Sequence, residues 1–373
     1  MSAPVHVVGR FPPPLDGQAV ATDSLADLLV RLDYDVTRHN VGAPEGEHLG
    51  VDGSRSRLRR LPHYVGLPAK LPRSLSGPAG EPVLWTSVSP SVLGHARDRA
   101  LVVPAFGRRP VVGVVHVGDF DRLFRSPLTA ASGRALVRRL RALVFLSEAL
   151  AARCALYVPE AKRWVVPNTI DAAAIPSVAE VEAARVRRIG RPGTRVLFLS
   201  GMFPSKGYGD VLDALAMLRD RGHDARGQFV GRWPSEDAER AFRARIETLR
   251  LGDRVEVVGG VERGRIRGLL LDADVLALPT TYPREAQPLT VIEALAAGTP
   301  VVVTRHASLP EMVTGPEGRF VAPGAPSEIA DAIVEVGAPD RWIDASRAAR
   351  VRFESAFSPE AVGARWRELL ARV

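Results

Sequence analysis

The stretch from Arg284 to Val303, REAQPLTVIEALAAGTPVVV, decides the fold of this chain. Proline is tolerated at or before the first turn of a helix, and Pro288 is followed by the apolar run from Leu289 to Ala297. Gly298 then ends the helix, and a valine-rich strand begins at Pro300. A helix that leads directly into a buried strand is the repeating unit of an α/β fold with a parallel sheet.

The same alternation extends in both directions from this stretch. Apolar runs rich in Val, Leu and Phe alternate with longer segments of helical period, so we expect two sets of parallel strands covered by helices. The first set is predicted at 5–8, 83–86, 111–116, 143–146 and 163–166, and the second at 195–200, 228–231, 254–258, 274–278, 300–303 and 318–321.

The length of 373 residues favours two domains. Residues 171–194 show no strand signal and end in a Gly/Pro cluster, so we place the linker near 189–194 and the domains at 1–188 and 189–357. A C-terminal helix is predicted over 358–373, with Val362, Trp366 and Leu369 at helical spacing. Periodicity leaves open which domain this helix covers; the N-terminal domain is one candidate.

Composition excludes several classes of protein. No run of about 18 apolar residues occurs and the start has no basic and apolar leader, so we expect a cytoplasmic protein that does not span a membrane. Cys154 is the sole cysteine, which excludes an internal disulfide or a thiolate metal site. The net charge of +8 is nearly all arginine. It indicates either a solvated surface or attraction to anionic lipid or phosphate; nucleic acid is disfavoured because no nucleic-acid-binding motif accompanies the charge.

Two features predict a site for a diphosphate. Free backbone N–H groups at Leu289, Thr290 and Val291 would make a positive helix terminus. Lys206 lies in LFLSGMFPSKGYGDVLDAL, where a strand ends and a helix starts around Gly207. A cation at a helix N-terminus is electrostatically unfavourable unless an anion joins it. A solvated surface lysine is the alternative.

Two carboxylates flank this predicted site. Glu285 lies in the loop before the helix and Glu293 lies one turn inside it. A carboxylate can accept hydrogen bonds from vicinal hydroxyls, so the pair could hold two sugars of one ligand. The alternative for Glu293 is structural, because Thr290 and Glu293 have the spacing of a capping box.

Three weaker candidates lie in the first half of the chain. His116 ends the run VVGVVHV and should project from the carboxyl edge of a parallel sheet, where ligands bind; a structural histidine is the alternative. Asp119 and Asp121 have a spacing that could hold a divalent metal, but such pairs arise by chance in this composition. Gly17, in the loop DGQAV, would let the backbone approach a ligand closely or simply form a turn.

These residues resemble glycosyltransferase family 4, a family of retaining enzymes. Glu285 and Glu293, with seven residues between them, match its E-x7-E motif, and EALAAGTPVV continues the match. The lysine-bearing segment, VVPNTID at 165–171 and FVGRWP at 229–234 are similar to other family segments. The resemblance implies an α/β GT-B fold, in which two Rossmann-like domains face each other across a deep cleft.

The resemblance also implies the role of each residue. Glu293 would hold the donor ribose, Glu285 the transferred sugar, and Lys206 the diphosphate, while His116 would approach the sugar from the other domain. The family often has an arginine five residues before the lysine, where this chain has Gly201. The resemblance then implies three catalytic residues, His116, Lys206 and Glu285. The residues that it implies for donor binding are Gly17, Gly231, Lys206, Glu285, Gln287, Pro288, Leu289, Thr290, Val291 and Glu293.

The predicted function is transfer of a sugar, with retention, from a nucleotide-diphosphate sugar to a glycan, lipid-linked or small-molecule acceptor. Neither a cofactor nor a metal is needed for this reaction, because the protein has only to stabilise the leaving diphosphate. A glycoside hydrolase, a nucleotide-sugar epimerase and a non-catalytic sugar- or nucleotide-binding protein are the alternatives. Residues 51–75 carry six basic residues against Asp52 alone, which predicts an acceptor-facing or membrane-facing surface or, alternatively, a solvated loop.

Overall fold

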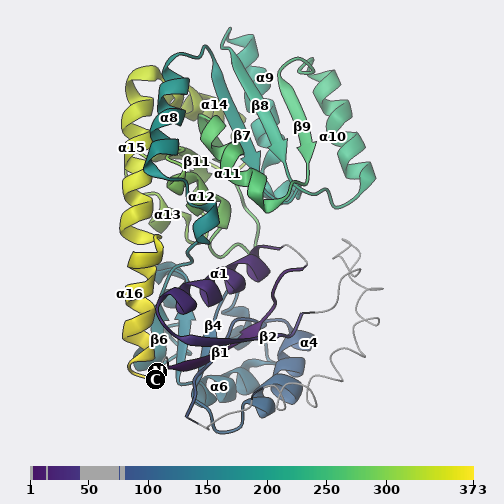
Figure 1. Cartoon of the computed structure of the whole chain (residues 1–373). Coiled ribbons are helices and arrows are strands. Elements are labelled where there is room, and N and C mark those ends of the chain that lie inside the picture. The colour runs from purple at the N-terminus through teal and green to yellow at the C-terminus, as the bar shows by residue number, and fades with distance from the viewer. Residues whose placement is uncertain (1–2, 14–15, 43–74, 76–79) are drawn as a thin grey trace. The chain divides into compact units, whose positions relative to one another are not determined.

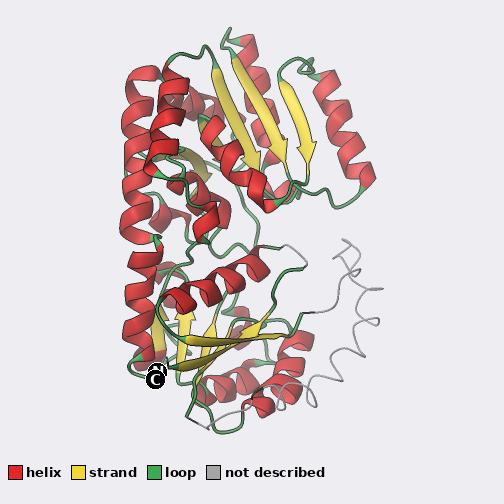
Figure 2. Ribbon diagram, viewed as in Figure 1, coloured by secondary structure: helices red, strands yellow, loops and turns green. Residues whose placement is uncertain are grey.

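In the computed structural model the described residues are 3–13, 16–42, 75 and 80–373. The chain forms two compact units. The first comprises Met1–Thr169, 284–287 and Pro359–Val373, and the second comprises Ile170–Pro283 and Pro288–Ser358. Each unit contains a six-stranded sheet whose paired strands are all parallel, covered by helices (Figure 1, Figure 2).

The sheet of the first unit has the strand order β2-β1-β3-β4-β5-β6. Alternate residues of β5 divide between two cores: Leu143 and Phe145 share a core with α5, α6 and α7, whereas Ala142 and Val144 share a core with α1 and α16. The elements are β1 (Pro4–Gly9), α1 (Gly17–Arg31), β2 (Asp35–Asn40), β3 (Val83–Trp85), α4 (Val92–Arg97), β4 (Val111–Val114), α5 (Arg122–Arg125), α6 (Ala130–Arg139), β5 (Ala142–Phe145), α7 (Glu148–Arg153), β6 (Arg163–Val165) and α16 (Pro359–Leu370).

The sheet of the second unit has the order β12-β11-β10-β7-β8-β9. The order therefore reverses between β7 and β10, and ligands bind at the carboxyl ends of strands at such a switch point. The elements are α8 (Val178–Ile189), β7 (Thr194–Leu199), α9 (Tyr208–Asp220), β8 (Ala225–Val230), α10 (Glu236–Thr248), β9 (Val255–Gly259), α11 (Arg263–Asp272), β10 (Val275–Leu278), α12 (Leu289–Ala296), β11 (Val301–Thr304), α13 (Leu309–Met312), β12 (Gly318–Val321), α14 (Pro326–Gly337) and α15 (Pro339–Ala356).

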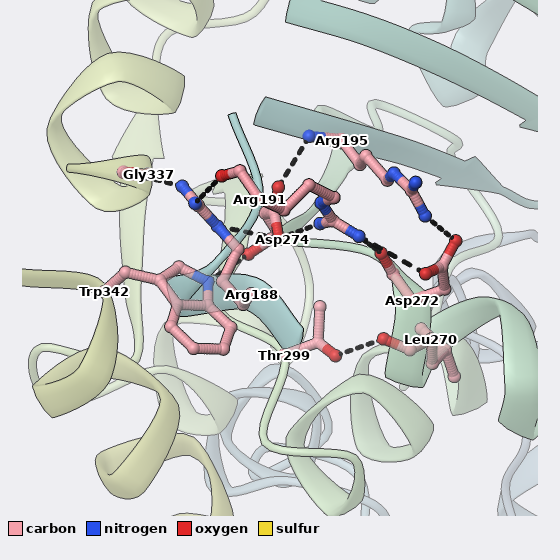
Figure 3. Close-up of polar contacts among 9 residues, drawn as sticks. All are labelled: Arg188, Arg191, Arg195, Leu270, Asp272, Asp274, Thr299, Gly337 and Trp342. Atoms are coloured by element: carbon pink, nitrogen blue, oxygen red, sulfur yellow. Dashed lines mark hydrogen bonds and ion pairs between the residues drawn. The ribbon is translucent and has the colours of Figure 1, made fainter. Parts of the chain in front are cut away.

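The units divide at Thr169, earlier than the boundary near 188 expected from the sequence. The reason is α8, which a capping box of Ser177 and Glu180 starts within the expected linker. Arg188 of α8 places its Nε 2.8 Å from Oδ1 of Asp274, a carboxylate that is buried at the start of β10 (Figure 3). The indole Nε1 of Trp342 donates to the Asp274 carbonyl at 2.8 Å. The buried contact of Arg188 fixes α8 to the second unit, and the contact of Trp342 fixes α15 to the same residue.

The C-terminal helix α16 belongs to the first unit. Its Val362, Trp366 and Leu369 join the core that contains Leu25 and Leu28 of α1. Among the described residues, which omit 1–2, 14–15, 43–74 and 76–79, no helix combines the length and apolar character needed to cross a bilayer.

Candidate active site

Lys206 lies at the switch point of the second sheet. After β7, a 3-10 turn over Pro204–Lys206 leads into α9 through Gly207, whose φ of 84° is in the left-handed region that favours glycine. The Thr281 amide, in the loop after β10, donates to the Ser205 carbonyl at 2.7 Å. Nζ of Lys206 lies 4.7 Å from the centre of the Tyr282 ring in the same loop. The loops after β7 and β10 are thus joined around the lysine.

Phe203 crowds position 201, where the family often has an arginine and this chain has glycine. A Cβ added to Gly201 would lie 3.1 Å from Cε2 of Phe203, so the aromatic ring covers this position. The Phe203 ring also stacks on Tyr282, with ring centres 6.2 Å apart and planes 18° apart. A side chain at 201 would require this ring to shift by a few tenths of an ångström.

The helix α12 begins at Leu289 with Pro288 as its N-cap residue, as the sequence predicted. The amide of Val291 donates to the Pro288 carbonyl at 3.1 Å, so the expectation of three free amides is wrong. For the amides of Leu289 and Thr290 the described residues provide no backbone acceptor. Two donors therefore remain at this helix terminus for an anion.

Glu293 does not form the capping box that the sequence allowed, since α12 starts without a side-chain cap. Instead its carboxylate, only 3% exposed, lies 2.9 Å from the guanidinium of Arg263 at the start of α11. Arg263 also donates to Oδ2 of Asp171 at 3.0 Å. Burial raises the pKa of Glu293 to about 7, and Arg263 opposes this rise. Near neutral pH Glu293 is therefore poised between its ionised and protonated forms.

Glu285 is held by the first unit, although the residues on either side of 284–287 belong to the second. Gly118 donates its amide to the Arg284 carbonyl at 3.3 Å. A Cβ on Gly118 would lie 1.8 Å from the Glu285 carbonyl oxygen, so only glycine permits this approach. The Glu285 residue is 8% exposed. The backbone on which Glu285 sits is therefore fixed against the loop after β4.

Gln287 holds the other end of this segment. Its Nε2 donates to the Leu146 carbonyl at 2.9 Å, and its Oε1 accepts from the Asn168 amide at 2.7 Å. The sequence assigned Gln287 to donor binding as part of a run. In the structure its amide group is engaged with backbone, which makes it an anchor for the Glu285 segment.

His116 lies two residues beyond β4, on the loop that carries Gly118. Its Nε2 is buried and has no hydrogen-bond partner among the described residues. Burial lowers the pKa of His116 to about 4, so the imidazole is neutral at physiological pH. A neutral ring with an unused nitrogen can bind a ligand hydroxyl, whereas a structural histidine would have its nitrogens satisfied.

The two predicted glycines have different surroundings. Gly17 is the first residue of α1, and a Cβ there would meet no atom of the described residues within 4 Å. Asp16 caps this helix by accepting from the Ala19 amide at 2.9 Å. At Gly231, directly after β8, a Cβ would lie 1.7 Å from the Ser200 carbonyl oxygen. Gly231 is thus required for the close approach of the ends of β7 and β8.

Asp121 is engaged in ion pairs. Its Oδ1 lies 2.8 Å from Arg153 and its Oδ2 lies 2.9 Å from Arg125. Both oxygens are therefore occupied, and the pairing with Asp119 gains no support as a metal site. Residues 51–74 of the predicted membrane-facing or acceptor-facing segment lie outside the described residues.

Two residues that support the candidate site, Arg263 and Gly118, could not be recognised from the sequence. Arg263 occurs in an arginine-rich helix, VERGRIRG, where nothing distinguishes it from its neighbours Arg265 and Arg267. Gly118 precedes an Asp-Phe-Asp sequence that reads as a turn. Both are identified only by contacts between segments far apart in the chain.

Part of the chain matches a known family. Residues 184–339 match the family described as "Glycosyl transferases group 1", a segment that includes Lys206, Glu285 and Glu293. A GDP-mannose-dependent alpha-(1-6)-phosphatidylinositol dimannoside mannosyltransferase of Mycobacterium tuberculosis is 36% identical over 162 residues, which are 42% of this chain and 40% of the relative. The chain thus spans less than half the length of the curated relative it matches.

Solved structures match the fold over the whole chain. Sucrose-phosphate synthase from Thermosynechococcus elongatus has a TM-score of 0.73 at 17% identity, covering 100% of both chains. Anabaena HepE in complex with UDP-glucose has a TM-score of 0.70 at 18% identity, covering 99% of both. The chain has the GT-B fold, and its residues 184–339 match the group 1 glycosyl transferase family.

Proposed function

We propose that this protein is a retaining glycosyltransferase that moves a sugar from a nucleotide-diphosphate sugar to a glycan, lipid-linked or small-molecule acceptor without a metal ion. One observation carries the proposal. Lys206 lies at the switch point of the second sheet, and the buried Glu293 lies one turn inside α12. A cation and a helix N-terminus at the carboxyl edge of the sheet support binding of a diphosphate.

In the transition state of the proposed reaction, the bond between the sugar and the diphosphate is largely broken before the bond to the acceptor has formed. Lys206 and the amides of Leu289 and Thr290 stabilise the charge that develops on the departing phosphate. Glu293 accepts hydrogen bonds from the ribose hydroxyls, and Glu285 accepts them from the transferred sugar. The acceptor hydroxyl attacks the sugar from the face that the diphosphate leaves, which gives retention. The proton of this hydroxyl passes to the leaving phosphate.

His116 and the Glu285 segment both belong to the first unit, and each is proposed to bind the transferred sugar. His116 offers a neutral imidazole nitrogen to a sugar hydroxyl. The anchors at Gly118 and Gln287 keep Glu285 in a fixed position relative to this histidine. Fixed donors and acceptors need no reorganisation when the transition state forms, which is the main source of rate enhancement in such sites.

The names of the similar proteins indicate which donors to test first. The mycobacterial relative uses GDP-mannose and acts on a phosphatidylinositol mannoside, and the HepE structure contains UDP-glucose. We therefore propose a hexose donor carried by GDP or UDP. A lipid-linked sugar is the first acceptor to test.

The experiment measures thermal stabilisation of the chain by nucleoside diphosphates and nucleotide sugars, followed by turnover with the ligand that stabilises most. A ligand that binds the folded state raises its apparent stability. Release of nucleoside diphosphate that depends on an acceptor supports the transferase. Interconversion of the free nucleotide sugar would instead indicate an epimerase, and binding without turnover over a broad acceptor panel would indicate a binding protein.

A further inference from the structure

The ribose end of the proposed donor site adjoins the loop between β9 and α11. Arg263 is the first residue of α11, and its guanidinium lies 2.9 Å from the carboxylate of Glu293. Its Nη2 is buried and has no hydrogen-bond partner among the described residues, a condition that a bound ligand would relieve. If Glu293 holds the ribose, the base attached to that ribose lies near this loop.

The ends of three neighbouring strands are tied together beside the loop. The strands β8 and β9 are paired in the sheet (Figure 1). The amide of Gly231, directly after β8, donates to the Gly259 carbonyl at 2.9 Å, and the amide of Met202, after β7, donates to the Arg232 carbonyl at 3.0 Å. All of these residues lie at the carboxyl edge of the sheet, where ligands bind.

Arg232 lies across the start of the loop. A Cβ added to Gly260 would lie 2.7 Å from Cγ of Arg232 and 3.4 Å from its Nε, so the arginine stem covers Gly260. Arg232 is exposed and has no ion pair or side-chain hydrogen bond with a described residue. The next residue, Trp233, packs on Tyr208 and Phe242, with ring centres 5.4 and 5.2 Å away. Trp233 thus anchors the segment and leaves the guanidinium of Arg232 for a ligand.

Glu262 supplies a carboxylate two residues after Gly260. It is the N-cap residue of α11, yet its side chain caps no amide. Ser, Thr, Asp and Asn are the residues that favour this position, so capping does not account for a glutamate here. Glu262 is exposed and, like Arg232, pairs with no side chain in the part of the chain that the structure describes. The loop therefore offers a base both a cation and a carboxylate.

Guanine matches these two side chains better than the other bases do. Its O6 and N7 are adjacent acceptors, which a guanidinium can bind with two hydrogen bonds. Its N1–H and its N2 amino group are adjacent donors, from which the two oxygens of a carboxylate can accept. Uracil has a single N–H donor between two carbonyls, and adenine has an amino donor beside N7, so neither base offers both pairs.

We propose that Arg232 and Glu262 recognise the base of the donor and select a guanine nucleotide. Arg232 donates to O6 and N7, and Glu262 accepts from N1–H and the N2 amino group. The assignment rests on the proposed function, because the ribose at Glu293 sets where the base lies. It adds the choice of base, which the proposed function leaves between GDP and UDP.

The test is calorimetric titration of the full chain with GDP, UDP and ADP. Wild-type protein should bind GDP about tenfold or more tightly than the other two. Arg232→Met should lower GDP affinity by about tenfold to a hundredfold and change UDP affinity little. Arg232→Lys should show the same loss, because lysine keeps the charge but not the two parallel hydrogen bonds. Arg226→Met is the matched control, since Arg226 is exposed near the amino end of the same strand.

Inosine diphosphate separates the roles of the two residues. Its base keeps O6, N7 and N1–H of guanine but lacks the N2 amino group. Wild-type protein should prefer GDP to inosine diphosphate by about tenfold, and Glu262→Ala should lose most of this preference. Arg232→Met should weaken both ligands alike. Glu256→Ala is the control, because Glu256 is an exposed carboxylate on β9.

Any of three outcomes would overturn the assignment. Wild-type protein could bind UDP or ADP as tightly as GDP. Arg232→Met could weaken all nucleotides equally while Arg232→Lys binds as the wild type does, which would make Arg232 a phosphate contact only. Glu262→Ala could keep the preference for GDP over inosine diphosphate. In each case a nucleotide still binds and the proposed function stands, whereas failure of folded wild-type protein to bind any nucleoside diphosphate would contradict that function and the base assignment together.

Discussion

The guanidinium of Arg263 lies 2.9 Å from the carboxylate of Glu293, within the second unit. This pair connects the start of α11 to the helix that is predicted to hold the donor. Burial favours the protonated form of Glu293 and the arginine favours the ionised form, so the balance between them sets the charge of Glu293 near neutral pH.

Binding of the preferred nucleoside diphosphate should strengthen as the pH rises through about 7. The pKa of Glu293 is raised to about 7, and the ionised carboxylate is the form that accepts two ribose hydroxyls. Ligand binding then releases a proton below this pH. Calorimetric titration between about pH 6 and pH 8 would measure the change. Glu293→Gln should lose this part of the pH dependence; an identical profile in that variant would exclude Glu293 from the ribose contact.

Replacing Arg263 by Met should move the midpoint of this pH dependence upward. The arginine lowers the pKa of Glu293, so its loss leaves burial unopposed and keeps the carboxyl group protonated to higher pH. Arg267→Met is the matched control, because Arg267 lies on the same helix and pairs with Glu180. If both variants keep the wild-type midpoint, Arg263 has no influence on ligand binding.

Gly118→Ala should reduce kcat/KM by about a hundredfold or more, as expected when a sugar-binding carboxylate is misplaced by about 1 Å. The added Cβ would lie 1.8 Å from the Glu285 carbonyl oxygen, so the segment must move. Gln287→Met removes the anchor at the other end and should give the same phenotype. Gly80→Ala is the control, since a Cβ at Gly80 meets no described atom within 4 Å. Wild-type kinetics in both anchor variants would contradict a positioning role.

Lys206→Ala should lower kcat/KM by about 10²- to 10³-fold, roughly 3 to 4 kcal/mol, because the leaving diphosphate loses a charged donor. Folding should survive, since the lysine contacts Tyr282 at a half-buried surface rather than in the core. Arg221→Ala removes an exposed cation of the same unit as a control. Unchanged turnover in pure, folded Lys206→Ala would remove this lysine from the mechanism.

The strands were predictable wherever both faces of the sheet are covered. Each of the eleven predicted strands is present. Buried strands such as β4, β5 and β10 are apolar throughout, which makes them easy to predict. The strand β2, with the sequence DVTRHN, was missed. It lies at the edge of its sheet and is mostly exposed, so it has no apolar signature. The boundary near 188 was misplaced because the capped helix α8 resembles a linker in composition but is bound through buried Arg188.

The parts of the candidate site that directly follow strands could be predicted from the sequence. Lys206 and the start of α12 follow strands directly, so their position at the carboxyl edge follows from sequence. The partners Arg263 and Gly118 could not be found in this way. Arg263 lies 30 positions from Glu293, and Gly118 lies more than 160 positions from Glu285. Only the tertiary fold brings these residues together.

The most direct test of the account is release of nucleoside diphosphate from GDP-mannose, UDP-glucose and related nucleotide sugars, measured with and without a lipid and glycan extract as acceptor. The account predicts acceptor-dependent release from one preferred donor, with the α-linked sugar retaining its configuration and with activity greatly reduced in Lys206→Ala and Glu285→Gln. Acceptor-dependent release that is equal in the wild-type protein and both variants, or no release from any donor by folded protein, would contradict it.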